Sequence, residues 1–266
     1  DFGGLSLPAI YSDNMVIQRG KPFVVKGTAN TGDEVRVKLG KHKAKAVAND
    51  RGEWTATFAP MQADGKNYTM TIECGKENIT YRNIAVGEVW LCSGQSNMAF
   101  MVKETSHAKE SLSDLSKDIR LYNMKPRVYT DNIEWSKEDL ECINRHNYYI
   151  STEWEVQNEK NVADFSAVAY HFGKMLADSL DVPVGLICNA IGGAPAEAFI
   201  DRKTLEWHPQ LVDILTNWKS NDMIQDWCRG RASKNIANGE NPLQRHPYEP
   251  TYLYETGIAP IACYNI

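Results

Sequence analysis

Residues 86–100, VGEVWLCSGQSNMAF, contain the change of pattern that decides the fold. The apolar run over residues 89–92 predicts a buried strand. A Ser-Gly-Gln turn at 93–95 ends this run, and a pattern typical of a helix follows. A strand, tight turn and helix of this kind present an activated serine, here Ser96, whose backbone N–H can face an oxyanion. Taken alone, the same composition is more often that of an ordinary loop.

The composition limits the class of protein. A chain of 266 residues exceeds the usual size of a single domain, which favours two domains. The net charge of −5 and the lack of a long apolar segment argue against nucleic-acid and membrane partners. The sequence opens at Asp1 without a signal peptide, so we expect a processed amino end and a secreted or periplasmic protein.

The six cysteines contain no Cys-x-x-Cys pair, so we expect no zinc site. Cys92 and Cys188 lie in apolar runs, where we expect small buried thiols.

Residues 1–85 predict an antiparallel β-sandwich domain. Apolar residues alternate with polar ones between turn residues, at 23–25, 35–39, 54–58 and 68–74. Strands at this spacing, each with one apolar face, are typical of two packed sheets. We expect Trp54 and Tyr68 to fill the core of this domain rather than to serve as stacking platforms for a sugar.

Residues 86–266 predict an α/β domain. Apolar residues at helical spacing predict one helix over 161–181, and the apolar run 184–188 predicts the strand that follows Pro183. A helix that leads into such a strand is half of a parallel crossover unit. His171 lies near the apolar stripe of this helix, where we expect a structural histidine. The remaining expectations are a strand at 119–124, a helix at 209–218, a polar surface segment at 103–118, a loop at 128–156 that lines a cleft, and a loop at 221–250.

A second glycine turn follows that strand directly, in residues 189–199, NAIGGAPAEAF. Open α/β sheets bind their ligands at the carboxyl ends of parallel strands, and glycine lets backbone N–H groups approach a ligand closely. An ordinary strand-to-helix turn has the same composition.

These two turns resemble two motifs of the sialate O-acetylesterase family, which belongs to the SGNH (GDSL-like) esterases and is related to acetylxylan esterases. Gly-Gln-Ser-Asn-Met at 94–98, after Glu-Val-Trp-Leu, is similar to the nucleophile motif of that family. Gly-Gly-x-Pro-x-Glu-Ala at 192–198 is similar to its second motif. The resemblance covers nearly the whole chain. It implies a three-layer α/β/α SGNH fold for residues 86–266, with an incomplete parallel sheet.

The resemblance also implies roles for individual residues. Ser96 is implied as the nucleophile, and an N–H of Gly193 or Gly192, with preference for Gly193, as an oxyanion donor. The remaining motif residues are implied to lie on the substrate side of the site, namely Gln95, Asn97 and Glu197.

The resembled family takes its general base from an Asp-x-x-His motif, and this pair is not recognisable here. Only His107 has an acid three residues before it, Glu104, and it follows Ser96 too closely for the order of the family. His208 and His246 precede a proline, as in the family, but lack the acid. We therefore expect the base in a carboxyl-terminal part of a longer esterase, which would be a partner of this chain.

The function implied by the resemblance is that of a serine esterase that removes O-acetyl groups from a carbohydrate without a metal or an organic cofactor. Sialic acid is the favoured sugar, and acetylated xylan or another hemicellulose is the alternative. Two further hypotheses are a non-catalytic carbohydrate-binding protein on the same scaffold and an esterase of another specificity. A lipase, for example, would need an extended apolar groove.

Overall fold

The structure is a computed structural model that describes residues 4–266. Its strands are β1 (Val16–Gln18), β2 (Phe23–Thr28), β3 (Glu34–Leu39), β4 (His42–Val47), β5 (Glu53–Phe58), β6 (Tyr68–Cys74), β7 (Glu77–Gly94), β8 (Ile119–Asn123), β9 (Glu155–Val156) and β10 (Val184–Ala190). Its α-helices are α1 (Ser96–Ala99), α2 (Ala108–Ser113), α3 (Lys137–Asn144), α4 (Glu159–Ala163), α5 (Ala167–Leu180), α6 (Arg202–Glu206), α7 (Ile214–Asn217) and α8 (Asp226–Asn235). Its short 3₁₀ or π turns are η1 (Val102–Glu104), η2 (Ala196–Phe199), η3 (Trp218–Ser220), η4 (Tyr254–Ile258) and η5 (Ala259–Tyr264). Within residues 4–266, every helix is too short or too polar to cross a membrane.

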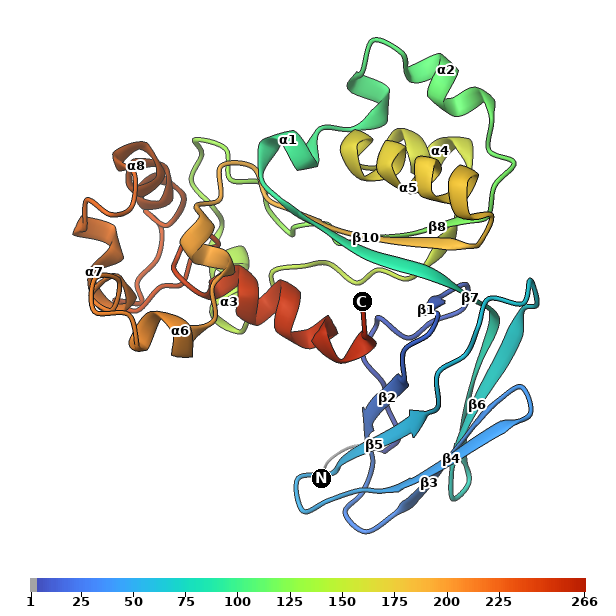
Figure 1. Ribbon diagram of the computed structural model, residues 1–266. Helices are drawn as coiled ribbons and strands as arrows, with labels where there is room; N and C mark the ends of the chain where they lie inside the picture. Colours follow the sequence, from blue (N-terminus) through green and yellow to red (C-terminus); the bar gives the residue numbers. More distant parts are fainter. Residues whose placement is uncertain (1–3) are drawn as a thin grey trace.

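One long strand, β7, connects the two parts of the fold (Figure 1). Its first part pairs antiparallel with β6, and its second part, from Glu88 to Gly94, pairs parallel with β10. Between them, β1 pairs parallel with residues 85–87. The sheet therefore continues in the order β4-β3-β6-β7-β10-β8-β9. The domain boundary expected between residues 85 and 86 falls inside β7.

The amino-terminal strands surround an apolar core. β3 and β5 bury every second residue, as their alternating sequences predict, and β2 pairs with β5 in a separate antiparallel sheet. Trp54 is 2% exposed and fills this core as expected. Tyr68 is half-buried, lies against Gly40 and donates a hydrogen bond to the Asp64 carboxylate.

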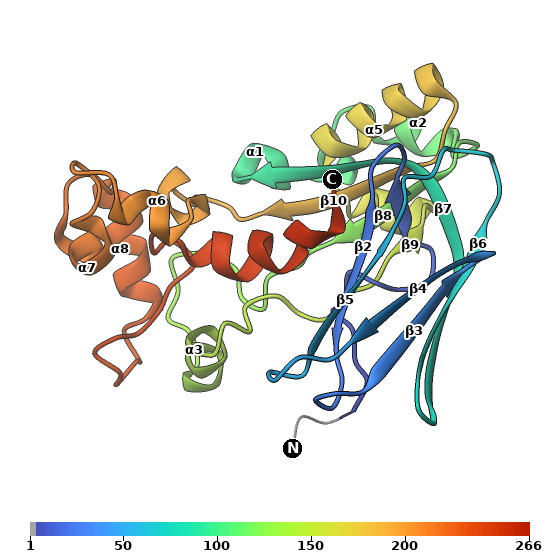
Figure 2. The same ribbon diagram turned by 60° about the horizontal axis from the view of Figure 1, so that its bottom comes forward.

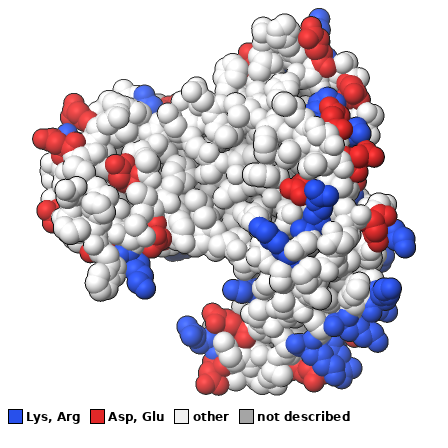
Figure 3. Space-filling view, in the orientation of Figure 1, with Lys and Arg blue, Asp and Glu red and all other residues white. Residues whose placement is uncertain are grey.

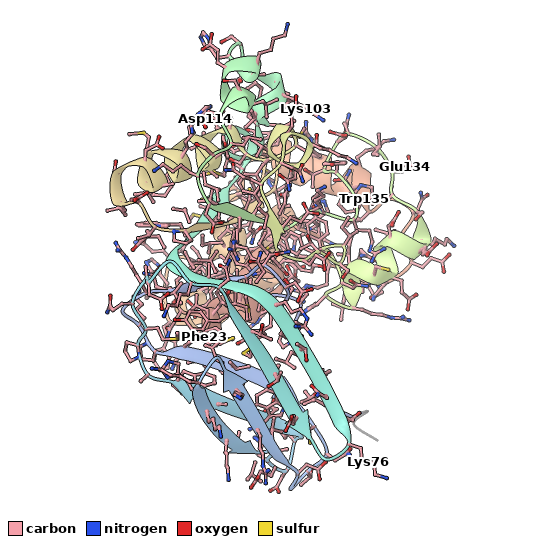
Figure 4. All side chains as sticks on the ribbon, turned by 90° about the vertical axis from the view of Figure 1, so that its right-hand side faces the viewer. Phe23, Lys76, Lys103, Asp114, Glu134 and Trp135 are labelled. Atoms are coloured by element: carbon pink, nitrogen blue, oxygen red, sulfur yellow. The ribbon has the colours of Figure 1, made fainter. Side chains whose placement is uncertain are left out.

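The last turns of the chain belong to the same core. Ile261 and Tyr264 of η5 are buried in it, and the Tyr264 hydroxyl donates to the backbone oxygen of Val16 at 2.6 Å. The Tyr264 ring meets that of Phe23 edge to face, with centroids 5.9 Å apart. Figure 4 shows Phe23 at the junction between the strands and the rest of the molecule, with Lys76 at the far tip of the strands.

Helices cover one face of the parallel strands, and the carboxyl-terminal turns lie on the other (Figure 2). Successive residues of β10 point to opposite faces. Leu186 and Cys188 therefore face α5, whereas Ile187 joins the amino-terminal core. A Cβ atom on Gly173 of α5 would lie 2.5 Å from the Leu186 side chain, so only glycine permits this close packing. The result is a mixed sheet with helices, as expected of an α/β fold.

The single helix expected over 161–181 is wrong in one respect, because the structure has two helices, α4 and α5. The backbone between them pairs with the segment after α1. Val102 N donates to Phe165 O at 2.9 Å, and Ala167 N donates to Phe100 O at 2.8 Å. The Ser166 hydroxyl then caps α5 by accepting from a backbone N–H. A continuous helix would use these backbone groups internally and could not make the pairing.

Two expected loops need correction, because the 128–156 segment contains α3 and β9 and the 221–250 segment contains α8. The polar surface segment expected at 103–118 contains α2. These helices have few apolar residues at helical spacing, so the sequence carries little periodic signal for them. The helix expected at 209–218 is reduced to α7, because residues 209–213 form turns.

A separate core holds α3, α6, α7 and α8 together. Inside it, the rings of His246 and Trp135 stack with their centroids 4.9 Å apart. His246 Nδ1 accepts from the Tyr248 N–H at 2.9 Å, so the proton lies on Nε2, which is 3.0 Å from Asn235 Oδ1. Complete burial lowers the pKa of His246 to about 3, because the charged ring would lose its hydration.

We expect the Gly87→Ala substitution to destabilise the fold, because a Cβ at residue 87 would lie 1.9 Å from the Pro183 carbonyl oxygen. The expected loss is about 1–3 kcal/mol, the usual cost of overpacking, or more since backbone must move. Urea denaturation measures it. The control is Gly230→Ala in α8, where a Cβ meets no atom within 4 Å and a gain of about 0.5–1 kcal/mol is expected. Equal stability of the Gly87→Ala variant and the parent would contradict this packing.

We expect acid to destabilise the fold through His246. Its folded-state pKa is lowered to about 3 from 6.5, so its contribution is complete above pH 6.5 and is lost as the pH falls towards 3. Over that window, the contribution of His246 to the slope of the unfolding free energy against pH approaches about 1.4 kcal/mol per pH unit. Urea denaturation at several pH values measures the slope. The His246→Gln variant should lose this part of the slope, even if it is less stable at neutral pH, and an unchanged slope would refute the assignment.

Candidate active site

The two glycine turns lie side by side because their strands are neighbours. β7 ends at Gly94 and β10 ends at Ala190, and these two residues are partners in the parallel register. Just beyond them, Ile191 N donates to Gly94 O at 3.0 Å. The turns therefore leave the same edge of the sheet, where parallel α/β sheets bind ligands.

Ser96 is exposed at the first position of α1. Backbone N–H groups in the first turn of a helix have no partner inside the helix, so the Ser96 N–H is free to bind an acceptor. The Ser96 hydroxyl lies 3.1 Å from the side-chain oxygen of Gln95, Oε1, and donates to it.

The N–H of Gly193 donates to the same atom, Gln95 Oε1, at 3.3 Å. One oxygen atom thus lies where the Ser96 hydroxyl and the Gly193 N–H converge. The oxyanion of a tetrahedral ester intermediate accepts from N–H donors beside the serine whose oxygen has attacked. The Gly193 N–H lies beside Ser96 in this way, because it shares one acceptor with the Ser96 hydroxyl.

Two hydroxyl groups fix the direction of the Gly193 N–H. The carbonyl of Gly192 accepts hydrogen bonds from Thr130 Oγ1 and from the Tyr248 hydroxyl, both at 2.7 Å. In a planar trans peptide the C=O and the following N–H point in opposite directions. Holding the Gly192 oxygen on one side thus directs the Gly193 N–H to the other, towards Gln95. Sequence reasoning missed Thr130 and Tyr248, because no motif marks them.

Gly192 and Gly193 have different structural roles. Gly193 has φ +75°, and a Cβ there would lie 2.3 Å from the Tyr248 hydroxyl and 2.9 Å from the Trp227 ring. A Cβ on Gly192 would meet no atom within 4 Å. Geometry therefore requires glycine at 193, the position preferred as oxyanion donor, while Gly192 contributes the carbonyl that orients the peptide.

A cleft of about 880 Å³ opens beside Ser96. Three exposed aromatic residues line it: Phe100 (47% exposed), Tyr129 (69%) and Trp227 (48%). Tyr129 comes from the segment expected to line a cleft, whereas Trp227 lies on α8, in a segment expected to be a loop. The Arg231 guanidinium lies 5.3 Å from the centre of the Trp227 ring, a cation–π distance.

Of the three other residues expected on the substrate side, one lies in the cleft and two do not. Gln95 lines the cleft, whereas Asn97 and Glu197 are not among the residues that line it. Asn97 is exposed, and the backbone oxygen of Glu197 accepts from Thr251 N at 3.0 Å. The roles expected for these side chains stay predictions.

The charges in the cleft are partly paired. Lys103 donates to Asp164 at 2.6 Å, and this contact lowers the pKa of the Asp164 carboxyl. Glu104 accepts from the Met101 N–H at 2.8 Å.

On the face drawn in Figure 3, Lys and Arg side chains gather over the amino-terminal strands.

Within residues 4–266, the histidines lie outside the lining of the cleft. His107 is exposed and lies 3.3 Å from Glu110, and His208 is also exposed. His246 is buried, with both ring nitrogens engaged. His171, expected to be structural, is exposed on α5 and lies 3.4 Å from the Ser111 hydroxyl. The described chain thus places Ser96 and the Gly193 N–H together, and places its histidines elsewhere.

The cysteines are all free thiols. Cys92 and Cys188 are buried, as expected, and burial raises the pKa of Cys92 to about 11 and that of Cys188 to about 12. Within residues 4–266, there is no group of three or more His, Cys, Asp or Glu side chains that could hold a metal ion.

Comparisons with known proteins find relatives that match part of the chain. The chain is 28% identical to mouse sialate O-acetylesterase over 214 residues, which is 74% of this chain and 38% of the mouse protein. It is 29% identical to the human sialate O-acetylesterase over 222 residues, 76% of this chain and 40% of that protein. The chain thus spans about two fifths of the length of these curated relatives. No family model matches it.

A solved structure has a similar fold. It is that of a carbohydrate acetylesterase from Xanthomonas citri, with a TM-score of 0.64 and 24% identity, covering 77% of this chain and 44% of that chain. The likeness shows that the mixed sheet and its helices follow the fold of that protein. The chain is thus similar in sequence to sialate O-acetylesterases over about three quarters of its length, and similar in fold to a carbohydrate acetylesterase.

Proposed function

We propose that this chain supplies the nucleophile and the oxyanion donors of a serine esterase that removes O-acetyl groups from a carbohydrate. The observation that carries the proposal is the convergence of the Ser96 hydroxyl and the Gly193 N–H on one oxygen atom, Gln95 Oε1. This convergence lies in an open cleft with exposed aromatic rings, which suits the apolar face of a sugar.

The proposed reaction begins when the acetyl group of the substrate replaces the Gln95 oxygen. Ser96 Oγ attacks the acetyl carbon and gives its proton to a base, and the carbonyl oxygen becomes an oxyanion. The N–H groups of Ser96 and Gly193 stabilise this oxyanion, each by about 3 kcal/mol. The sugar hydroxyl then leaves with a proton, and water releases acetate from the acetylated serine.

Within residues 4–266, the lining of the cleft has no histidine that could accept the proton of Ser96. In the resembled family an Asp and a His fill this role. We propose that the remaining, carboxyl-terminal part of the same protein brings this pair to Ser96, as a partner of the region described.

The substrate proposed first is an O-acetylated sialic acid, because the curated relatives are named as sialate O-acetylesterases. Acetylated xylan or another hemicellulose is the alternative. The cleft has charged side chains between its apolar ones, among them Lys103, Asp164 and Arg231, which disfavours the long acyl chain of a lipase substrate. A separate β-sandwich domain over residues 1–85, an SGNH three-layer domain over 86–266, and a secreted or periplasmic location also stand as proposals.

The test of the proposal is release of acetate from an O-acetylated sugar by the full-length protein, which includes the proposed carboxyl-terminal part. We expect Ser96→Ala to lower the rate by at least about 10³-fold, because the attacking oxygen is lost. The matched control, Ser93→Ala, removes a neighbouring hydroxyl at the end of β7 and should keep the rate within a few-fold. Undiminished release by the Ser96→Ala variant would exclude Ser96 as nucleophile. Sugar binding without any release would favour a non-catalytic binding protein.

A second prediction concerns the peptide between Gly192 and Gly193. Tyr248→Phe and Thr130→Val each remove one hydrogen bond to the Gly192 oxygen, worth about 1 kcal/mol. We expect each to lower kcat about fivefold, with the double variant nearing the ~10²-fold loss of a whole oxyanion donor. The KM should change little. The control is Tyr252→Phe, whose buried hydroxyl donates to Ile143 O at 2.7 Å. If it lowers kcat equally, the effect is one of stability and not of peptide orientation.

A further inference from the structure

A second cavity adjoins the cleft at Ser96. It has a volume of about 500 Å³, within the range of small-molecule sites. Asn123, Lys125 and Asp164 line both this cavity and the cleft. We call this second cavity the side groove. It extends from the carboxyl end of β8 past β9 to α4, along the edge of the sheet.

The walls of the side groove are held by backbone and capping contacts. Ile150 N donates to Lys125 O at 3.0 Å, which holds the loop before β9 against the segment after β8. On the other side, Asn158 and Asn161 exchange hydrogen bonds of 2.8 Å between side chain and backbone at the start of α4. A site already held in its shape loses less conformational entropy when a ligand binds.

The lining of the side groove suits a ligand rich in hydroxyl groups. Half of its polar lining residues have hydroxyl or amide side chains, namely Asn123, Ser151, Thr152, Asn158 and Asn161. The hydroxyls of Ser151 and Thr152 make no hydrogen bond within residues 4–266 and are open to a ligand. Ile150, 43% exposed, offers an apolar surface next to them. Alternating hydroxyl groups and apolar C–H faces are the surface of a sugar.

The charges of the side groove argue against an acidic ligand. Its lining has three carboxylates, of Glu153, Glu155 and Asp164, and two ammonium groups, of Lys125 and Lys160. Asp164 is paired with Lys103, which lies in the cleft and not in the side groove. The surface of the side groove is therefore net negative or neutral and does not attract a ligand carboxylate. An uncharged sugar is not repelled by it.

We propose that the side groove binds the neutral sugar residues linked to the acetylated sugar, so that the substrate is an oligosaccharide and not a free monosaccharide. This inference rests on the proposed function, because it places the acetylated residue in the cleft at Ser96. Asn123 and Lys125 would then contact the linkage between the two sites, since they line both.

The test measures how affinity depends on ligand length, by isothermal titration calorimetry with sugars that carry no acetyl group. The pairs are xylose against xylotetraose, and free sialic acid against sialyllactose. In at least one pair we expect the longer ligand to bind the parent protein at least tenfold more tightly. Ser151→Trp, at an exposed position of the side groove, should abolish this gain and leave the monosaccharide affinity unchanged.

The control variant is Ser113→Trp, which adds the same ring at an exposed serine of α2 outside both cavities. It should preserve the gain with length. Absence of a length gain in both pairs, or a gain that survives Ser151→Trp, would overturn the proposal. Ser96-dependent hydrolysis of p-nitrophenyl acetate, which is too small to reach the side groove, tests the esterase function separately. The Ser151→Trp variant should retain it.

Discussion

The parallel register between β7 and β10 is the constraint on which the site depends. It sets Gly94 opposite Ala190, so that two turns far apart in the sequence leave the sheet together. A shift of one residue in either strand would turn the side chains of that strand to the opposite face. It would also part the Ser96 hydroxyl from the Gly193 N–H. β7 resists such a shift because it is fixed along its length by β6, β1 and β10.

The region around α8 contributes Trp227 and Arg231 to the cleft, and it also holds the peptide between Gly192 and Gly193. Tyr248 reaches the Gly192 carbonyl with its hydroxyl, while its own backbone N–H is bound by His246. The His246 ring is in turn held by its stacking on Trp135 and by Asn235. His246 is therefore a structural support behind the peptide between Gly192 and Gly193. Its neutral, buried ring fits this role, since a base must reach the nucleophile.

The sequence predicted the parts of the fold and site that local patterns encode. Ser96 and Gly193, which the structure brings together, could be named because each lies in a short motif after an apolar strand. Thr130 and Tyr248 were not, because their importance comes from which carbonyl they reach in three dimensions. The interruption near Ser166 was missed for a similar reason. Apolar spacing continues through it, but pairing with residues 100–102 breaks the helix. α8 was missed because its apolar residues do not recur at helical spacing. Cys228 is buried and its neighbour Trp227 is exposed, and tertiary contacts decide which of them faces the core.

The position of Tyr264 has a consequence for how the protein is made. Its ring is buried among Tyr11, Phe23 and Trp154, and its hydroxyl binds the backbone of β1. Chains fold from the amino end as they are synthesised, at roughly 5–20 residues per second. The first strands must therefore wait, with part of their apolar surface uncovered, until η5 has emerged from the ribosome. During that interval the apolar faces of β2 and β5, which η5 covers in the folded protein, stay exposed to water.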